Sequence, residues 1–161
     1  MIDKKRYENA LAFAAKKHEG QFRIGGLPYI THPVAVAEIV KEKGGDTDAT
    51  EEEILFFGNK KILHSVKLLT KQSNYVMKNY VEGIRKDATA FLVKGADRLH
   101  NLRSAVCADT EFKRRYIYET IDWYLDFLPE IPSAVKELAQ TLDVPLKDLP
   151  FIYEPIENWK I

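Results

Sequence analysis

Apolar and polar positions near the start of the chain recur with helical spacing. Between residues 3 and 18, one apolar stripe is formed by Tyr7, Ala10, Leu11, Ala14 and Ala15. Intervals of three and four residues place these side chains on one face of an α-helix. Glycines and a proline then predict a loop over residues 20–28. Pro33 suits the first turn of a second helix, which ends near Gly44 and Gly45.

Helical spacing continues through the rest of the sequence. A capping-box pattern at Thr50–Glu53 predicts a short helix, and apolar periodicity predicts another over residues 62–71. Further helices are predicted over residues 74–86, 88–107, 111–128 and 132–142. No segment alternates with a period of two, so strands should be few or absent. We therefore predict an all-α fold, a single helical bundle over residues 1–161 whose tail, residues 145–161, packs back on it.

Composition and charge narrow the functional classes. The chain has 161 residues, 45% of them hydrophobic, which suits one domain with an ordinary core. Its 24 basic and 24 acidic side chains cancel, so a nucleic acid or a membrane surface is not the expected partner. The one cysteine, Cys107, has no partner for an internal disulfide. No stretch approaches the roughly 18 apolar residues of a spanning helix, and the amino terminus lacks a signal-peptide pattern, so we predict a cytoplasmic protein.

One face of the helix predicted over residues 88–107 carries candidate chemistry. Asp97, Asn101 and Ser104 fall at positions i, i+4 and i+7 and therefore share a face. A carboxylate, an amide and a hydroxyl placed together can ligate a cation and hydrogen-bond a ribose or a phosphate. The alternative is a solvated helix face on which Asp97 pairs with Arg98 or Lys94.

The loop before the second helix carries a second candidate group. Arg23 and Tyr29 place a guanidinium and an aromatic ring on a glycine-rich turn next to His32. This arrangement suits stacking against a base and neutralising a phosphate, with the histidine as a metal ligand. The alternatives are that His32 only caps the helix and that the loop is an ordinary surface turn.

These segments together resemble the HD-domain hydrolases of guanosine bispyrophosphate alarmones, over most of the chain and in the same order. The blocks that carry the resemblance are Ala12-Phe-Ala-Ala-Lys-Lys-His18, Gln21-Phe-Arg23, Gly26-Leu-Pro-Tyr-Ile-Thr-His32-Pro33-Val-Ala-Val-Ala37, Lys94-Gly-Ala-Asp97-Arg-Leu-His-Asn101-Leu-Arg103 and Tyr116-Ile-Tyr-Glu-Thr120. The length resembles that of the small, stand-alone members. The resemblance implies a helical enzyme that uses manganese and removes the 3′-pyrophosphate from the alarmone.

The resemblance also implies roles for individual residues. His32 and Asp97 would be two metal ligands. Arg23 would lie against the guanine, Asn101 would bind the ribose, and Ser104 would line the nucleotide pocket. Tyr29 is added to these as a nucleotide-binding residue because its aromatic ring suits stacking against a base.

The chain departs from the family pattern between these blocks. The family carries a His-Asp dipeptide on a central helix, followed by a Glu-Asp pair that orients the attacking water, and this chain has no His-Asp dipeptide. Gly45 stands where the catalytic glutamate would be, and Asp46 is the acid carried over to the catalytic position. His100 belongs to the motif but is expected to point away from the face of Asp97. His32 and Asp97 are the two metal ligands that remain, whereas catalytic metal sites use about three protein ligands.

Three functions follow as hypotheses. The first is a metal-dependent pyrophosphohydrolase that acts on a guanine 3′,5′-bispyrophosphate with a divalent cation such as manganese. The second is a non-catalytic module that binds guanine nucleotide without turnover. The third is a structural protein that forms homo-oligomers through apolar surface left uncovered where the central helix is missing.

Overall fold

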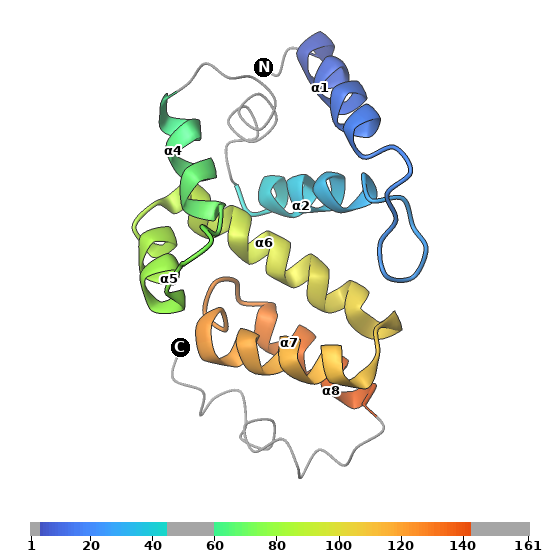
Figure 1. Cartoon of the computed structure of the whole chain (residues 1–161), viewed down its shortest axis with the longest axis vertical. Helices are drawn as coiled ribbons and strands as arrows, with labels where there is room; N and C mark the ends of the chain where they lie inside the picture. The colour runs from blue at the N-terminus through green and yellow to red at the C-terminus, as the bar shows by residue number, and fades with distance from the viewer. Residues whose placement is uncertain (1–3, 45–59, 143–161) are drawn as a thin grey trace.

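The 17-residue helix α6 (Ala88–Ser104) runs through the middle of the molecule (Figure 1). The computed structural model describes residues 4–44 and 60–142. The other elements in these ranges are α1 (Lys4–Lys17), α2 (Thr31–Glu42), α4 (Lys60–Leu69), α5 (Met77–Arg85), a 3-10 turn η1 (Ala105–Cys107), α7 (Thr110–Trp123) and α8 (Ile131–Gln140). Because α6 contacts α2, α4, α5, α7 and α8, it organises the fold.

The helices pack on two sides of α6. In Figure 1, α2 lies on one side, while α7 and α8 lie side by side on the other. The apolar core is concentrated where α6, α7 and α8 meet, with contributions from α2 and α5. Its largest fully buried apolar side chains include Tyr124, Ile84, Leu99, Leu102, Ile117, Ile131 and Leu138. The opposite face of α6 is therefore left to meet α2, and the candidate site lies between these two helices.

Side-chain caps fix where α6 and α7 begin. Asp87 accepts a hydrogen bond from the backbone N–H of Ala90 at 2.7 Å, which satisfies a free donor at the start of α6. The same carboxylate accepts from the hydroxyl of Ser65 at 3.0 Å, so it also ties α4 to α6. Asp109 caps α7 in the same way, at 2.7 Å from the N–H of Phe112.

The all-α prediction is confirmed in the described ranges, where the extended pairing is limited to one isolated bridge between Phe22 and Pro28. The prediction of one helix over residues 111–128 is wrong at its end, because α7 stops at Trp123. The apolar pattern continues through buried Tyr124, Phe127 and Leu128, but these residues form a turn that leads to Pro129. A proline disfavours the helical conformation of the residue before it, so Pro129 excludes Leu128 from the helix, but this effect does not reach back to Trp123, where α7 ends.

The other helices predicted within the described residues are present, with ends that shift by at most three residues. The short helix predicted at Thr50–Glu53 and the tail 145–161 lie outside the described residues. In the part of the chain that is described, no helix is both long and apolar enough to cross a membrane.

Candidate functional site

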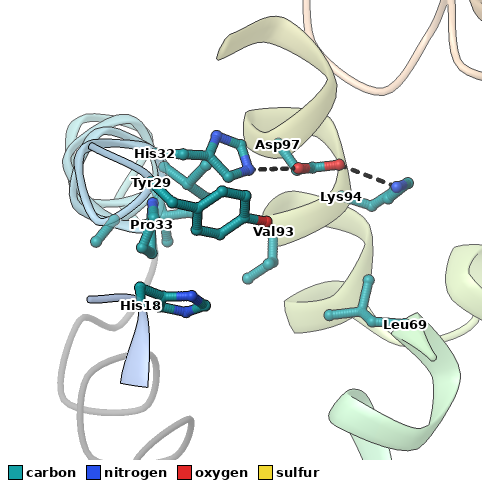
Figure 2. Close-up of a pocket in the computed structure, with 11 residues that line it drawn as sticks. His18, Tyr29, His32, Pro33, Leu69, Val93, Lys94 and Asp97 are labelled. Carbon is teal, nitrogen blue, oxygen red and sulfur yellow. Dashed lines mark hydrogen bonds and ion pairs between the residues drawn. The ribbon is translucent and has the colours of Figure 1, made fainter. Parts of the chain in front are cut away.

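A pocket of about 430 Å3 lies between α2, α6 and the end of α4. One part of its lining is polar and consists of His18, Tyr29, His32, Lys94 and Asp97. The other part is apolar and consists of Pro33, Val36, Ala37, Val40, Leu69 and Val93. Figure 2 shows Leu69 facing the polar group across the pocket. This division into a polar and an apolar part suits a small ligand that has both charged and ring-shaped portions.

The first turn of α2 and the middle of α6 bring the two predicted metal ligands together. His32 Nε2 lies 3.0 Å from Asp97 Oδ1, although 65 positions separate the two residues in sequence. On the other side of the carboxylate, Lys94 Nζ lies 2.9 Å from Asp97 Oδ2 (Figure 2). Asp97 therefore pairs with Lys94 rather than Arg98, whose guanidinium binds Glu119 at 2.9 Å.

The carboxylate of Asp97 is held in its charged form. Burial by itself would raise its pKa, but the hydrogen bond from His32 and the ammonium group of Lys94 outweigh the burial. The net result is a pKa well below the usual range. Asn101 adds a third contact, since its Nδ2 donates to Asp97 Oδ1 at 3.0 Å. Asp97 thus presents a full negative charge beside the pocket at neutral pH.

The loop before α2 folds back on itself and presents Arg23 to α6. The backbone N–H of Arg23 donates to the carbonyl of Leu27 at 2.8 Å, and Gly25 and Gly26 turn the chain at the tip with φ of 99° and 85°. Only glycine adopts such positive φ values without strain. The guanidinium of Arg23 then reaches Asn101, with Nη2 2.8 Å from Oδ1.

His100 is part of this group, and the prediction that it points away from Asp97 is wrong. His100 Nδ1 lies 2.8 Å from His32 Nδ1 and 2.7 Å from Arg23 Nη1. The physical reason is helix geometry, because residues three apart, such as Asp97 and His100, are neighbours on a helix surface. Burial, followed by electrostatic interactions with Arg23 and His32, lowers the pKa of His100 to about 4. Its ring is therefore neutral at physiological pH.

Two aromatic rings form the edge of the polar part of the pocket. The rings of His18 and Tyr29 lie 4.7 Å apart between centroids, and the ring of Tyr29 meets that of His32 edge-on at 6.0 Å. Tyr29 remains 37% exposed, so part of its side chain is accessible to a ligand. Base stacking on such rings is favourable.

The other predicted residues take different places. Arg23, Asn101 and Ser104 are not among the residues that line the pocket. Arg23 and Asn101 lie behind it and bind each other, while the hydroxyl of Ser104 donates to the backbone carbonyl of His100 at 2.7 Å. Asp46 lies outside the described residues. The structure thus brings together His32, Asp97 and Tyr29 at the pocket and places Arg23 and Asn101 next to them.

A divalent cation would find two suitable ligands here. Divalent cations bind imidazole nitrogens and carboxylate oxygens, which His32 and Asp97 supply. Within residues 4–44 and 60–142, no group of three or more histidine, cysteine or acidic side chains is close enough together to hold a metal. Catalytic metal sites use about three protein ligands. The described residues therefore fit only part of a cation site.

Two polar residues that line the pocket, His18 and Lys94, were not predicted to be site residues. Both lie inside the quoted sequence blocks, and Lys94 precedes Asp97 by three positions. This spacing brings side chains together on a helix, so it was the available signal for Lys94. His18 gives no such local signal, because its place depends on the fold of the loop that follows α1.

The relatives found by comparison with known proteins have related names. No family model matches the chain. A "GTP pyrophosphokinase" of Myxococcus xanthus is 31% identical over 175 residues, which covers 91% of this chain and 22% of that protein. A "probable guanosine-3′,5′-bis(diphosphate) 3′-pyrophosphohydrolase" of Synechocystis is 32% identical over 179 residues, covering 94% of this chain and 23% of that protein. The "bifunctional (p)ppGpp synthase/hydrolase SpoT" of Escherichia coli K12 is 32% identical over 146 residues, covering 74% of this chain and 21% of that protein.

The lengths of these matches carry further information. The chain spans about a fifth of the length of the curated relatives it matches. The matches of 175 and 179 positions are longer than the 161 residues of the chain itself. The relatives therefore have residues inside the matched segment that have no counterpart here. With this shared segment, the chain belongs to the guanosine-3′,5′-bis(diphosphate) 3′-pyrophosphohydrolase family.

Proposed function

We propose that the chain binds guanosine 3′,5′-bis(diphosphate) in the pocket between α2 and α6 and, with a divalent cation, hydrolyses its 3′-pyrophosphate. The observation that carries this proposal is the convergence of His32 and Asp97, 3.0 Å apart, at a pocket with a polar and an apolar part. The relatives' names supply the substrate. Two of these names describe proteins that make or cleave this nucleotide.

The chain's own residues divide the work of binding. His32 and Asp97 would hold a cation such as manganese, which when bound would supply an activated water and neutralise phosphate charge. The ammonium of Lys94, 2.9 Å from Asp97, is placed to attract a phosphate group. The exposed face of Tyr29 offers a stacking surface for a base. The apolar part of the pocket excludes water around the ligand.

Arg23, Asn101 and Ser104 would act from behind the pocket. Arg23 and Asn101 are bound to each other, so a direct contact with guanine or ribose requires one of them to turn towards the ligand. Ser104 would have to release its bond to the carbonyl of His100. Asp46, by resemblance, would orient the attacking water.

A second candidate function is nucleotide binding without turnover. It is supported by the number of metal ligands: the described residues bring two together, whereas catalytic metal sites use about three. The extra residues that the relatives have within the matched segment support it as well. Under this alternative, nucleotide affinity would not depend on a cation and would fall with rising salt, because charge attraction dominates it.

Release of pyrophosphate tests the first proposal. The chain is incubated with manganese and guanosine 3′,5′-bis(diphosphate), beside a His32→Ala/Asp97→Ala variant. Loss of a residue that only supports a metal ligand already lowers metal affinity or activity about 10–100-fold. We therefore expect the rate of pyrophosphate release to be at least about 100-fold lower in this variant, which lacks both ligands. His64→Ala/Asp122→Ala is the matched control, since both side chains are exposed outside the pocket.

Two results would contradict hydrolysis at this site. Equal release by the wild-type chain and the His32→Ala/Asp97→Ala variant would place the chemistry elsewhere. Absence of release together with retained nucleotide binding would favour the non-catalytic module.

We also propose that the chain works in the cytoplasm, without nucleic acid or membrane as a partner. The balanced charge of 24 basic and 24 acidic side chains supports this proposal. Homo-oligomers are a further proposal, tested by the mass of the particle in solution.

A further inference from the structure

Two side chains approach the carboxylate of Asp97 from opposite sides (Figure 2). Lys94 Nζ lies 2.9 Å from Oδ2, and His32 Nε2 lies 3.0 Å from Oδ1. Lys94 precedes Asp97 by three positions on α6, so the two side chains are neighbours on one side of the helix. The ammonium group of Lys94 is therefore paired with the same carboxylate that a divalent cation would use as a ligand.

We propose that Lys94 competes with a divalent cation for Asp97 and thereby limits how tightly the chain binds that cation. This deepens the proposed function and rests on it for the place of the cation, at His32 and Asp97. The role assigned to Lys94 is the opposite of the role of a residue that supports a metal ligand.

The position of the ammonium group is defined by its surroundings. The side chain of Lys94 is 16% exposed and that of Asp97 is 26% exposed, so water and salt screen this pair less than a surface pair. Lys94 Nζ also lies 5.6 Å from the ring centroid of Tyr124, a fully buried residue, in a cation–π contact. By contrast, Lys78 and Glu82 are 4.0 Å apart and 72% and 52% exposed, as in an ordinary surface pair.

The charges around the pocket oppose a further cation. Among the described residues that line the pocket, Asp97 is the one acidic side chain and Lys94 is the one lysine or arginine. Their two charges cancel. Behind the pocket, the guanidinium of Arg23 lies 2.8 Å from Asn101, which itself donates to Asp97. A divalent cation would therefore meet positive charges that repel it, and replacing Lys94 by a neutral residue would leave Asp97 free to attract it.

Competition and support predict opposite effects on cation affinity. A charge within about 4–6 Å of a carboxylate changes its affinity for a proton about tenfold or more. If Lys94 competes with the cation, its removal should tighten cation binding by a comparable factor. If Lys94 only orients Asp97, its removal should weaken cation binding about 10–100-fold, as the loss of other supporting residues does.

The test measures manganese binding to the chain without nucleotide, by electron paramagnetic resonance of the free ion at fixed pH and ionic strength. Lys94→Met removes the charge and the hydrogen bond, whereas Lys94→Gln removes the charge and keeps an N–H donor. We expect both variants to bind manganese at least about tenfold more tightly than the wild-type chain. Lys78→Met is the matched control, because it removes an exposed lysine outside the pocket and should leave the affinity unchanged.

A double variant shows where the additional manganese affinity arises. Lys94→Met/Asp97→Asn keeps the neutral residue at position 94 and removes the carboxylate, so it should lose the tighter binding. Tighter binding that persists in this variant would overturn the proposal, because the ion would then lie elsewhere. Thermal unfolding identifies variants that lose the fold, and either single variant of Lys94 that keeps it is sufficient for the test.

The outcomes separate this proposal from the proposed function. If the wild-type chain binds manganese and the variants of Lys94 bind it equally or more weakly, the competition is refuted and the proposed cation site stands. If only the variants bind manganese, the competition is supported and the wild-type chain lacks the cation that the proposed hydrolysis needs. If none of the proteins binds manganese, the proposal is overturned, because removing Lys94 did not make Asp97 available to the ion.

Discussion

At the scale of single residues, the carboxylate of Asp97 is the most heavily contacted group of the site. Oδ1 lies 3.0 Å from both His32 Nε2 and Asn101 Nδ2, while Oδ2 lies 2.9 Å from Lys94 Nζ. These contacts more than offset the burial of the carboxyl and keep its pKa low. The charge that a cation would meet is therefore already in place in the folded chain, and Lys94 balances it until a cation binds.

The neutral ring of His100 makes stability depend on pH. Its pKa is about 4 in the folded chain and about 6.5 when unfolded. Between these values the unfolded chain binds a proton that the folded chain does not, so the free energy of unfolding falls as pH drops from about 6.5 to about 4. We expect His100→Gln to flatten this part of the profile, measured by urea unfolding at several pH values. Parallel profiles for both proteins would contradict the assignment.

The sequence predicted some residues of the site and not others. His32 and Asp97 could be predicted because both lie in motifs that resemble a known family, and the fold brings them to 3.0 Å. His100 was misplaced, because counting positions from Asp97 by four and seven overlooks the neighbour at three. The bond between Arg23 and Asn101 spans 78 positions and depends on how the loop before α2 folds, which no local pattern encodes.

At the scale of helices, α6 is fixed to α7 by a buried cation. Arg98 is 2% exposed, and its guanidinium lies 4.2 Å and 4.1 Å from the ring centroids of Tyr116 and Tyr124. It donates to Glu119 at 2.9 Å and to Thr120 at 3.3 Å. Consecutive helix residues point about 100° apart, so this anchor leaves Asp97, its neighbour in sequence, on the side that faces α2.

Two glycines give a matched test of packing around α6. A Cβ at Gly95 would lie 2.9 Å from Leu128 Cγ and 3.2 Å from the carbonyl oxygen of Phe127, whereas at Gly83 it would meet only Leu68 Cδ2, at 3.4 Å. Overpacking costs about 1–3 kcal/mol, and alanine gains up to about 1 kcal/mol over glycine in a helix. We expect Gly95→Ala to lower the free energy of unfolding and Gly83→Ala to raise it slightly. Equal effects in urea unfolding would refute the close contact of α6 with this turn.

Helix positions were predictable from apolar spacing, but one end was not. The pattern that predicts α7 runs on through Tyr124, Phe127 and Leu128, because a buried turn needs apolar side chains as much as a helix does. Pro129 disfavours helical geometry at Leu128, so it marks the end of the buried turn and not the end of α7 at Trp123. By contrast, the spacing of apolar residues in the sequence does not specify which helices pack against α6.

At the scale of the whole molecule, the chain spans about a fifth of the length of its relatives and holds one pocket between α2, α4 and α6 in its described residues. Its formal net charge is zero, yet His32, Lys94 and Asp97 gather charged and titratable groups at one place. The apolar part of the same pocket is formed by α2, α4 and α6. We therefore expect the residues of the pocket, and not the overall charge of the chain, to determine nucleotide binding.

The most direct measurement is a calorimetric titration of guanosine 3′,5′-bis(diphosphate) into the chain and two double variants. Tyr29→Ala/Lys94→Met changes two residues that line the pocket, and Tyr75→Ala/Lys78→Met makes the same changes at exposed positions away from it. We predict one bound nucleotide per chain, an affinity at least about tenfold weaker in the first variant, or about 1.4 kcal/mol, and an unchanged affinity in the second. No binding by the wild-type chain, or equal binding by all three proteins, would contradict this prediction.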